Sequence, residues 1–142
     1  LTPSGWQHWR KTLYRRFRHT SAFTSEGLLL VGGADSPTTT ELLPWEGGES
    51  REGFTLKDAR KRHCSIQTSP DTIVLTAGEN SEFMVTEFRG LNAGDEVTSK
   101  QLPRLLHPRY DHACTWYTVG DIQVRLVLPR PLSLNWSSRC SW

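Results

Sequence analysis

The sequence has no long apolar run, no closely paired cysteines and no strong excess of one charge. No apolar stretch approaches the roughly 20 residues that a transmembrane helix needs, which excludes a helical membrane span. The three cysteines, Cys64, Cys114 and Cys140, form no CxxC pair, so a zinc or redox motif of that kind has no support. The chain starts at Leu1, and its first residues lack the apolar stretch of a signal peptide.

What the sequence contains instead is short apolar runs separated by turn residues. Apolar residues make up 36% of the 142 residues, which suffices for a buried core and argues against disorder. The 11 Gly and 8 Pro that punctuate these runs favour strands and turns over long helices. The composition therefore predicts an all-β fold of one domain.

An Arg-x-x-His quartet occurs three times, at residues 16–19, 60–63 and 109–112. Its histidines are spaced 44 residues (from 19 to 63) and then 49 residues (from 63 to 112). Self-similarity at a period in this range is the mark of a repeat architecture. The spacing predicts a propeller built from four-stranded blades.

Further features follow the first two quartets in the same order. An apolar strand ends in two small residues, at 32–33 in the first unit and 77–78 in the second. A Thr-Glu-apolar stretch follows at 40–42 and 86–88, and then a polar loop and a leucine precede the next arginine. Agreement in order and spacing indicates a true repeat. The residues that define it are Arg16, His19, Gly32, Gly33, Arg60, His63, Gly78, Arg109 and His112.

Strands are expected where apolar or β-branched runs lie between turn residues. The expected strands cover residues 20–24, 28–31, 38–45, 64–68, 72–76, 83–88, 97–102 and 112–117. The stretch 121–129 also fits a strand, but it lacks the glycine pair of the earlier units. Apolar residues between 6 and 17 are spaced as on one face of a helix, whereas the repeat favours a strand near Leu13.

The recurring residue types suit a crowded junction between a loop and a strand. Paired glycines allow positive φ or close approach of another backbone, and Ala77, in place of a glycine, would be strained at positive φ. The planar fork of arginine can satisfy loop carbonyls or a carboxylate. We therefore interpret Arg16, Arg60 and Arg109 as structural braces. A ring of arginines that grips a ligand is the competing interpretation.

These residues resemble the kelch repeat family, whose units combine an Arg-x-x-His stretch, an apolar strand ending in Gly-Gly and a Thr-Glu-aromatic strand. The run that matches best is Leu-Pro-Arg-Leu-Leu-His-Pro-Arg-Tyr-Asp-His-Ala-Cys at residues 102–114, and the resemblance covers residues 13–117. It implies a β-propeller whose exposed loops bind other proteins. A few kelch proteins are oxidases with a copper site.

Two units and part of a third are too few to close such a ring. The resemblance therefore implies a partial kelch-like β-propeller with about two four-stranded blades plus an incomplete third, either a fragment of a longer propeller or a chain with a divergent end. The expected parts are a basic N-terminal segment at 1–18 (the end of a preceding blade, or an arm), repeats at 19–62 and 63–111, a partial repeat at 112–128 and an irregular tail at 129–142.

The sequence predicts no catalytic, cofactor-binding or metal-binding residue. The close His–Cys pairs at 63–64 and 112–114 lie at equivalent repeat positions, so repetition accounts for them without a metal. Asp111 beside His112 has no accompanying nucleophile elbow, and no phosphate-binding glycine loop is present. We expect a chain that is not an enzyme.

The expected function is that of a non-catalytic protein–protein interaction module, which presents polar loops to a protein partner of unknown identity. The loops are residues 35–38, 46–53, 80–82 and 92–98. The first alternative is a fragment of a kelch-type enzyme, an oxidase or hydrolase, with its catalytic groups elsewhere.

The second alternative is nucleic-acid binding through the basic start. Residues 1–25 carry five Lys or Arg and no acid, within a net charge of +2, and mix these bases with tryptophans. No cofactor and no membrane partner are expected. The compartment stays open between cytoplasmic, which is slightly favoured, and secreted, which would make the Asn-Trp-Ser at 135–137 a glycosylation acceptor.

Overall fold

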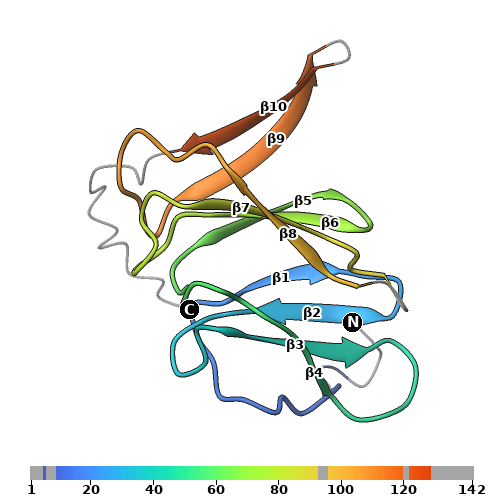
Figure 1. The fold of residues 1–142 in the computed structure, drawn as a ribbon. Coiled ribbons are helices and arrows are strands. Elements are labelled where there is room, and N and C mark those ends of the chain that lie inside the picture. Colours follow the sequence, from blue (N-terminus) through green and yellow to red (C-terminus); the bar gives the residue numbers. More distant parts are fainter. Residues whose placement is uncertain (1–4, 6–8, 93–95, 120–121, 129–142) are drawn as a thin grey trace.

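Two four-stranded antiparallel sheets and a two-stranded hairpin make up the fold (Figure 1). The computed structural model describes residues 5, 9–92, 96–119 and 122–128, and in these ranges it contains ten strands and no helix. The all-β prediction is confirmed. None of the described segments forms a helix long and apolar enough to cross a membrane.

Sheets 1 and 2 share a meander order, in which each strand pairs with the next along the chain. Sheet 1 contains β1 (Thr20–Phe23), β2 (Gly27–Val31), β3 (Thr39–Pro44) and β4 (Arg51–Thr55). Sheet 2 contains β5 (Cys64–Ser69), β6 (Thr72–Thr76), β7 (Val85–Arg89) and β8 (Thr98–Leu102). The hairpin pairs β9 (Ala113–Val119) with β10 (Ile122–Leu128).

One apolar core joins sheet 1 to sheet 2. Leu29 and Val31 lie two residues apart on β2 and point to the same face of their sheet, as Ile73 and Leu75 do on β6. Burial of each such side chain contributes about 1.5–3 kcal/mol relative to exposure, which makes this face-to-face packing a main source of stability. The buried members of the core are Ala22, Leu29, Val31, Leu42, Leu56, Ile73, Leu75, Phe88 and Leu91.

The first strands of successive units lie side by side. β5 contacts both β1 and β9. Figure 1 shows sheet 1, sheet 2 and the hairpin stacked in this order, so that sheet 2 lies in the middle. Each sheet is therefore positioned by the equivalent strand of its neighbour.

The same residues of each unit adopt left-handed backbone conformations. The residue before each repeat histidine has positive φ: Arg18 (57°), Arg62 (57°) and Asp111 (49°). The corners that follow β2 and β6 also agree, with φ of 59° at Gly32 and 50° at Ala77. Positive φ is uncommon outside glycine, so its recurrence at matching positions is a property of the turn rather than of one side chain.

The structure corrects two expectations about irregular segments. The predicted loop 46–53 ends early, because β4 begins at Arg51. No strand forms near Leu13, since residues 9–16 have neither strand nor helix conformation. The side chain of Leu13 is 51% exposed, unlike that of Leu56, with which the repeat equates it.

The corners after β2 and β6 offer a matched pair of substitutions. In Gly32→Ala the new Cβ would lie 2.5 Å from the carbonyl oxygen of Arg60, so we expect the free energy of unfolding to fall by about 2 kcal/mol or more. Ala77→Gly relieves about 1–2 kcal/mol of left-handed strain but loses a buried methyl worth about 0.8 kcal/mol. The substitution also raises the conformational entropy of the unfolded chain, which opposes folding. We therefore expect the free energy of unfolding to change by less than about 1 kcal/mol. Urea denaturation measures both, and equal losses would contradict the equivalence of the two corners.

Candidate functional site

The three Arg-x-x-His turns are linked to one another by backbone hydrogen bonds. The amide of Arg62 donates to the carbonyl oxygen of Arg18 at 3.0 Å, and the amide of Asp111 donates to the carbonyl oxygen of Arg62 at 2.9 Å. These residues hold the same place in their turns, two positions after the arginine. Each turn is therefore held by the one before it.

The second and third turns also bind the small-residue corner of the sheet before them. The amide of Gly33 donates to the carbonyl oxygen of Arg60 at 2.8 Å, and that of Gly78 donates to the carbonyl oxygen of Arg109 at 3.0 Å. A Cβ on these glycines would lie 2.9 Å and 2.8 Å, respectively, from a backbone carbonyl oxygen. Only glycine fits such an approach, which explains the second small residue of each pair.

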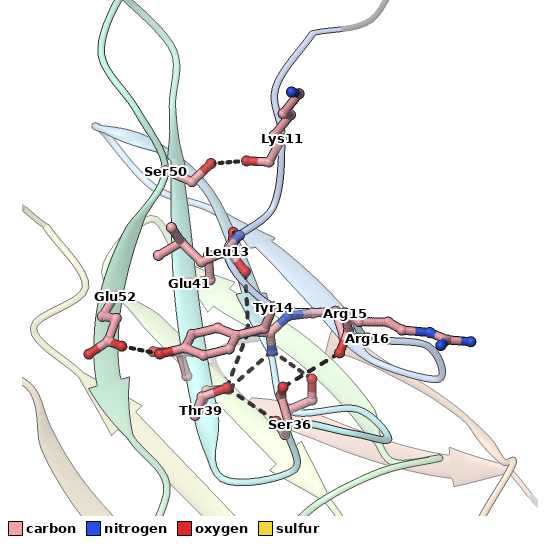
Figure 2. A network of polar contacts seen from close by, with 12 residues as sticks. Lys11, Leu13, Tyr14, Arg15, Arg16, Ser36, Thr39, Glu41, Ser50 and Glu52 are labelled. Atoms are coloured by element: carbon pink, nitrogen blue, oxygen red, sulfur yellow. Dashed lines mark hydrogen bonds and ion pairs between the residues drawn. The ribbon is translucent and has the colours of Figure 1, made fainter.

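Arg16 is a buried brace in sheet 1 (Figure 2). Its Nη1 donates to the carbonyl oxygen of Gly32 at 2.7 Å, and its Nη2 lies 3.2 Å from a carboxylate oxygen of Glu41. The two charged side chains are 2% and 0% exposed. Glu41 also accepts the amide of Leu13 at 2.6 Å. Loss of either charged partner would leave an uncompensated buried charge, at a cost of about 3–5 kcal/mol.

Polar contacts continue along the segment that precedes Arg16. The hydroxyl of Ser50 donates to the carbonyl oxygen of Lys11 at 2.5 Å, and the hydroxyl of Tyr14 donates to the carboxylate of Glu52. Figure 2 shows both contacts, each between the segment and a residue of the neighbouring stretch at Ser50 or Glu52. Residues 9–16 are thus anchored to sheet 1 and do not project as a free basic arm.

Arg60 is the equivalent brace in sheet 2, but its hydrogen bonds go to neutral groups. Its Nη1 donates to the carbonyl oxygens of Ala77 (3.2 Å) and Met84 (3.3 Å), and its Nη2 donates to Oγ1 of Thr86 (2.7 Å). The residue is 1% exposed. Burial lowers the pKa of Arg60 to about 10, against a smaller opposite effect of Asp58.

Arg109 holds the same place ahead of the hairpin, and it is half-buried. Its carbonyl oxygen binds the corner at Gly78. Arg16 and Arg60 each bond to the corner that follows the second strand of their own sheet. The corresponding corner of the hairpin would begin at residue 129, outside the described residues.

Strand register explains why the two braces have different partners. β3 and β7 pair with their neighbours in the same register, so Glu41 corresponds in space to Thr86. The sequence repeat instead matches Glu41 with Glu87, one residue further along. Because side chains alternate across a strand, Glu87 points to the face opposite that of Thr86. The predicted Thr-Glu feature is therefore wrong by one residue, and a hydroxyl stands where sheet 1 has a carboxylate.

The second and third repeat histidines reach back to threonines of the preceding sheet. Nε2 of His63 lies 2.8 Å from Oγ1 of Thr20, and Nε2 of His112 lies 2.8 Å from Oγ1 of Thr76. Both imidazoles are buried, whereas His19 in the first turn is exposed. Burial lowers the pKa of both buried histidines, that of His63 to about 3. Both are therefore neutral at pH 7.

A disulfide joins sheet 2 to the hairpin. Cys64 on β5 is bonded to Cys114 on β9, across a sequence separation of 50 residues. The sequence predicts both as small buried apolar residues, and the covalent bond corrects that reading. The spacing of the cysteines carries no local motif that would have indicated the bond. A closed loop of this length restricts the unfolded chain by roughly 4 kcal/mol on entropic grounds.

A charged cluster bridges the second and third turns at the surface. The guanidinium of Arg62 binds the carboxylate of Asp111 and lies 3.5 Å from that of Glu79, which is 3.0 Å from Nζ of Lys61. The ring of Tyr110 lies 4.6 Å from Cζ of Arg62. Hydrogen bonding to Asp111 raises the pKa of Arg62, and bonding to Lys61 lowers the pKa of Glu79. Solvent screens such pairs, so they shape the surface more than they stabilise the fold.

The described residues assemble no metal site, and Asp111, His112 and Cys114 do not form a nucleophile relay. They contain no group of three or more His, Cys, Asp or Glu side chains that could hold a metal ion. The carboxylate of Asp111 binds Arg62, while Nε2 of His112 is bonded to Thr76. Cys114 has no thiol because it is part of the disulfide.

The four loops predicted to bind a partner lie at two opposite ends of the sheets. In an antiparallel meander, successive connections alternate between the ends. Residues 35–38 and 80–82 follow β2 and β6, at the end where the Arg-x-x-His turns lie, and they bond to those turns. The parts of 46–53 and 92–98 that precede β4 and β8 join the last two strands of each sheet at the other end, with 93–95 outside the described residues.

That other end carries an exposed aromatic stack, which no sequence pattern indicates. The ring of Trp45 lies between those of Trp9 and Phe23, with centroid distances of 5.6 Å and 5.8 Å. The three side chains are 39%, 47% and 65% exposed, respectively. The indole Nε1 of Trp45 donates to the carbonyl oxygen of Thr24 at 2.9 Å, which fixes the middle ring. Exposed aromatic side chains are enriched at protein interfaces.

Comparison with known proteins assigns no family to the chain. Neither a scan of family models nor a search of curated proteins finds a match to the chain. What the chain does must therefore be inferred from its own residues.

The buried histidines make stability depend on pH. Because the pKa of His63 in the folded chain is about 3, below its ordinary value of 6.5, only the unfolded chain gains this proton between those values. The free energy of unfolding should fall as the pH drops below 6.5, by up to about 1.4 kcal/mol per pH unit for this group. Urea denaturation at several pH values should show a shallower fall for His63→Gln. His107→Gln, which changes an exposed residue, is the control, and equal slopes in all three proteins would refute the assignment.

The number of free thiols reveals whether the disulfide is present, and it can be measured by alkylation. Of the three cysteines, only Cys140 should react with iodoacetamide in the denatured, non-reduced chain, and all three should react after reduction. Reduction should lower the free energy of unfolding by about 2–4 kcal/mol, measured in denaturant. Cys140→Ser is the control and should leave no reactive thiol before reduction. Labelling of three sites in the non-reduced wild type would rule the bond out.

Proposed function

We propose that this chain is part of a kelch-like β-propeller, with about two four-stranded blades and an incomplete third. The observation that carries the proposal is the series of bonds from turn to turn, in which Arg62 binds the carbonyl of Arg18 and Asp111 binds that of Arg62. Sheets that are joined at the same point, with their first strands side by side, suit radial packing around one axis. β1, β5 and β9 have this relation.

The function that this surface supports best is non-catalytic binding of a protein partner. The aromatic stack favours this function, because large aromatic side chains contribute much of the binding energy of many protein interfaces. Phe23 is the most exposed of its three rings, at 65%. Phe23 and Trp45 lie at strand ends and the three rings pack against one another, so little side-chain entropy would be lost on binding. The binding surface is therefore assigned to the end of sheet 1 that holds the stack.

The disulfide bears on where the partner would be met. Structural disulfides form and persist in oxidising compartments and are rare in the cytosol. The bond between Cys64 and Cys114 therefore favours a secreted or luminal location over the cytoplasmic one that the sequence slightly favours. An extracellular protein or receptor is the kind of partner that follows.

Nucleic-acid binding is a second candidate, which a specific arrangement favours. Cζ of Arg10 lies 5.9 Å from the ring of Trp9, and Cζ of Arg18 lies 5.6 Å from the ring of Phe17. Exposed basic and aromatic groups of this kind bind single strands. Arg16 is buried against the carboxylate of Glu41 and therefore does not contribute to this patch. The enzyme-fragment alternative would require catalytic groups outside this chain.

Loss of the outermost ring tests the partner-binding surface. Phe23→Ser should weaken capture of partner proteins by at least about 10-fold, because it removes an anchor of about 1.4 kcal/mol or more. The measurement is quantitative affinity capture from extracellular fluid with the oxidised full chain as bait. Leu106→Ser is the matched control. Leu106 is 92% exposed and follows β8, at the end of the sheets opposite the aromatic stack.

A set of captured proteins that does not change with Phe23→Ser would count against this surface. Binding of a single-stranded oligonucleotide that falls steeply with salt would instead support the second candidate. Both measurements use the same protein and the same two variants.

A further inference from the structure

Arg60 is a buried cation without a carboxylate partner among the described residues. Its guanidinium donates to two backbone carbonyls and to the hydroxyl of Thr86. None of the ion pairs formed by the described residues includes it. A buried charge that is only hydrogen-bonded to neutral groups is costly unless a counter-charge approaches.

Sheet 1 shows what completes such a site. The equivalent guanidinium, that of Arg16, lies 3.2 Å from the carboxylate of Glu41, and the two side chains are almost wholly buried. The remaining bonds of the two arginines correspond, since each donates to the corner carbonyl of its own sheet. Thr86 takes the place of Glu41, so sheet 2 keeps the cation and lacks the anion.

A pocket of about 240 Å³ opens beside Arg60, between the segment that follows β4 and the outer strands of sheet 2. Its charged lining residues are Lys57, Asp58 and Arg60, which sum to one positive charge. Asp58 lies close enough to raise the pKa of Arg60 slightly but forms no ion pair with it. The pocket is therefore positive and has room for a group larger than water.

The neutral lining residues suit an oxygen-rich ligand with an apolar stem. Thr86 donates its hydroxyl to Oε1 of Gln101 at 3.3 Å, while Nε2 of Gln101 donates to the carbonyl oxygen of Val85 at 2.7 Å. These bonds hold the amide in place. Ser99 adds a hydroxyl at the pocket wall, and Phe88 adds an apolar surface.

We propose that this pocket binds a carboxylate group, which supplies to Arg60 the negative charge that Glu41 supplies to Arg16. The planar guanidinium matches a carboxylate in shape and in number of donors. The carboxylate can come from a small free ion or from a glutamate side chain of a bound peptide. The proposal does not depend on the assignment of the aromatic stack as an interface.

Thermal unfolding of the full oxidised chain in sodium acetate tests the proposal, at pH 7 and constant ionic strength. Acetate should raise the Tm of the wild type in a saturable manner, by roughly 5 °C at ten times its Kd. Thr86→Glu should raise the Tm without acetate and abolish the response, because it builds the missing carboxylate into the chain. Arg60→Met should also abolish the response and serves if Thr86→Glu does not fold.

Two blocked tripeptides distinguish the sources of the carboxylate. If the site accepts a side chain, acetyl-Gly-Glu-Gly-amide should raise the Tm at lower concentration than acetate, and acetyl-Gly-Gln-Gly-amide should have no effect. A response to acetate but not to the Glu peptide would assign the site to a small free ion. The absence of any saturable response in the wild type, or an equal response in Thr86→Glu, would overturn the proposal.

Discussion

The structure depends on backbone hydrogen bonds that join the three Arg-x-x-His turns in series, with the middle turn bound from both sides. The residue two positions after the arginine adopts positive φ, which directs its amide to one turn and its carbonyl to the next. Arg62 makes both bonds, to Arg18 and from Asp111. Because these bonds use only the backbone, the arrangement is the same whether the residue is Arg or Asp. The three turns lead into β1, β5 and β9, and β5 contacts both of the other strands.

Local pattern was sufficient to predict most strands. β6 covers the residues that the apolar run and its flanking turns indicate, and the whole fold is all-β as the composition suggests. The start of β4 was assigned to the loop 46–53 because four of the five residues of this strand are exposed, so it has no apolar alternation to detect. For residues 9–16 the apolar spacing indicates a helix or a strand, and the structure has neither. Their apolar spacing is real, but the segment is held by polar contacts such as that of Arg16 with Glu41.

The site was less predictable, because it depends on contacts between residues far apart in the sequence. The quartets identify the arginines and histidines, but the partner of each arginine is set by strand register. A one-residue difference places Thr86 rather than Glu87 beside Arg60. The aromatic stack joins rings from residues 9, 23 and 45, and no local motif relates them. Such features require the pairing of strands to be known first.

The disulfide has a topological consequence for the integrity of the chain. Cys64 and Cys114 enclose nearly all of sheet 2 between them. A protease that cuts one peptide bond between these cysteines would leave the two pieces covalently attached. The nicked molecule would keep its mass under oxidising conditions and separate only when reduced, so that damage to an exposed loop of sheet 2 need not release either flank.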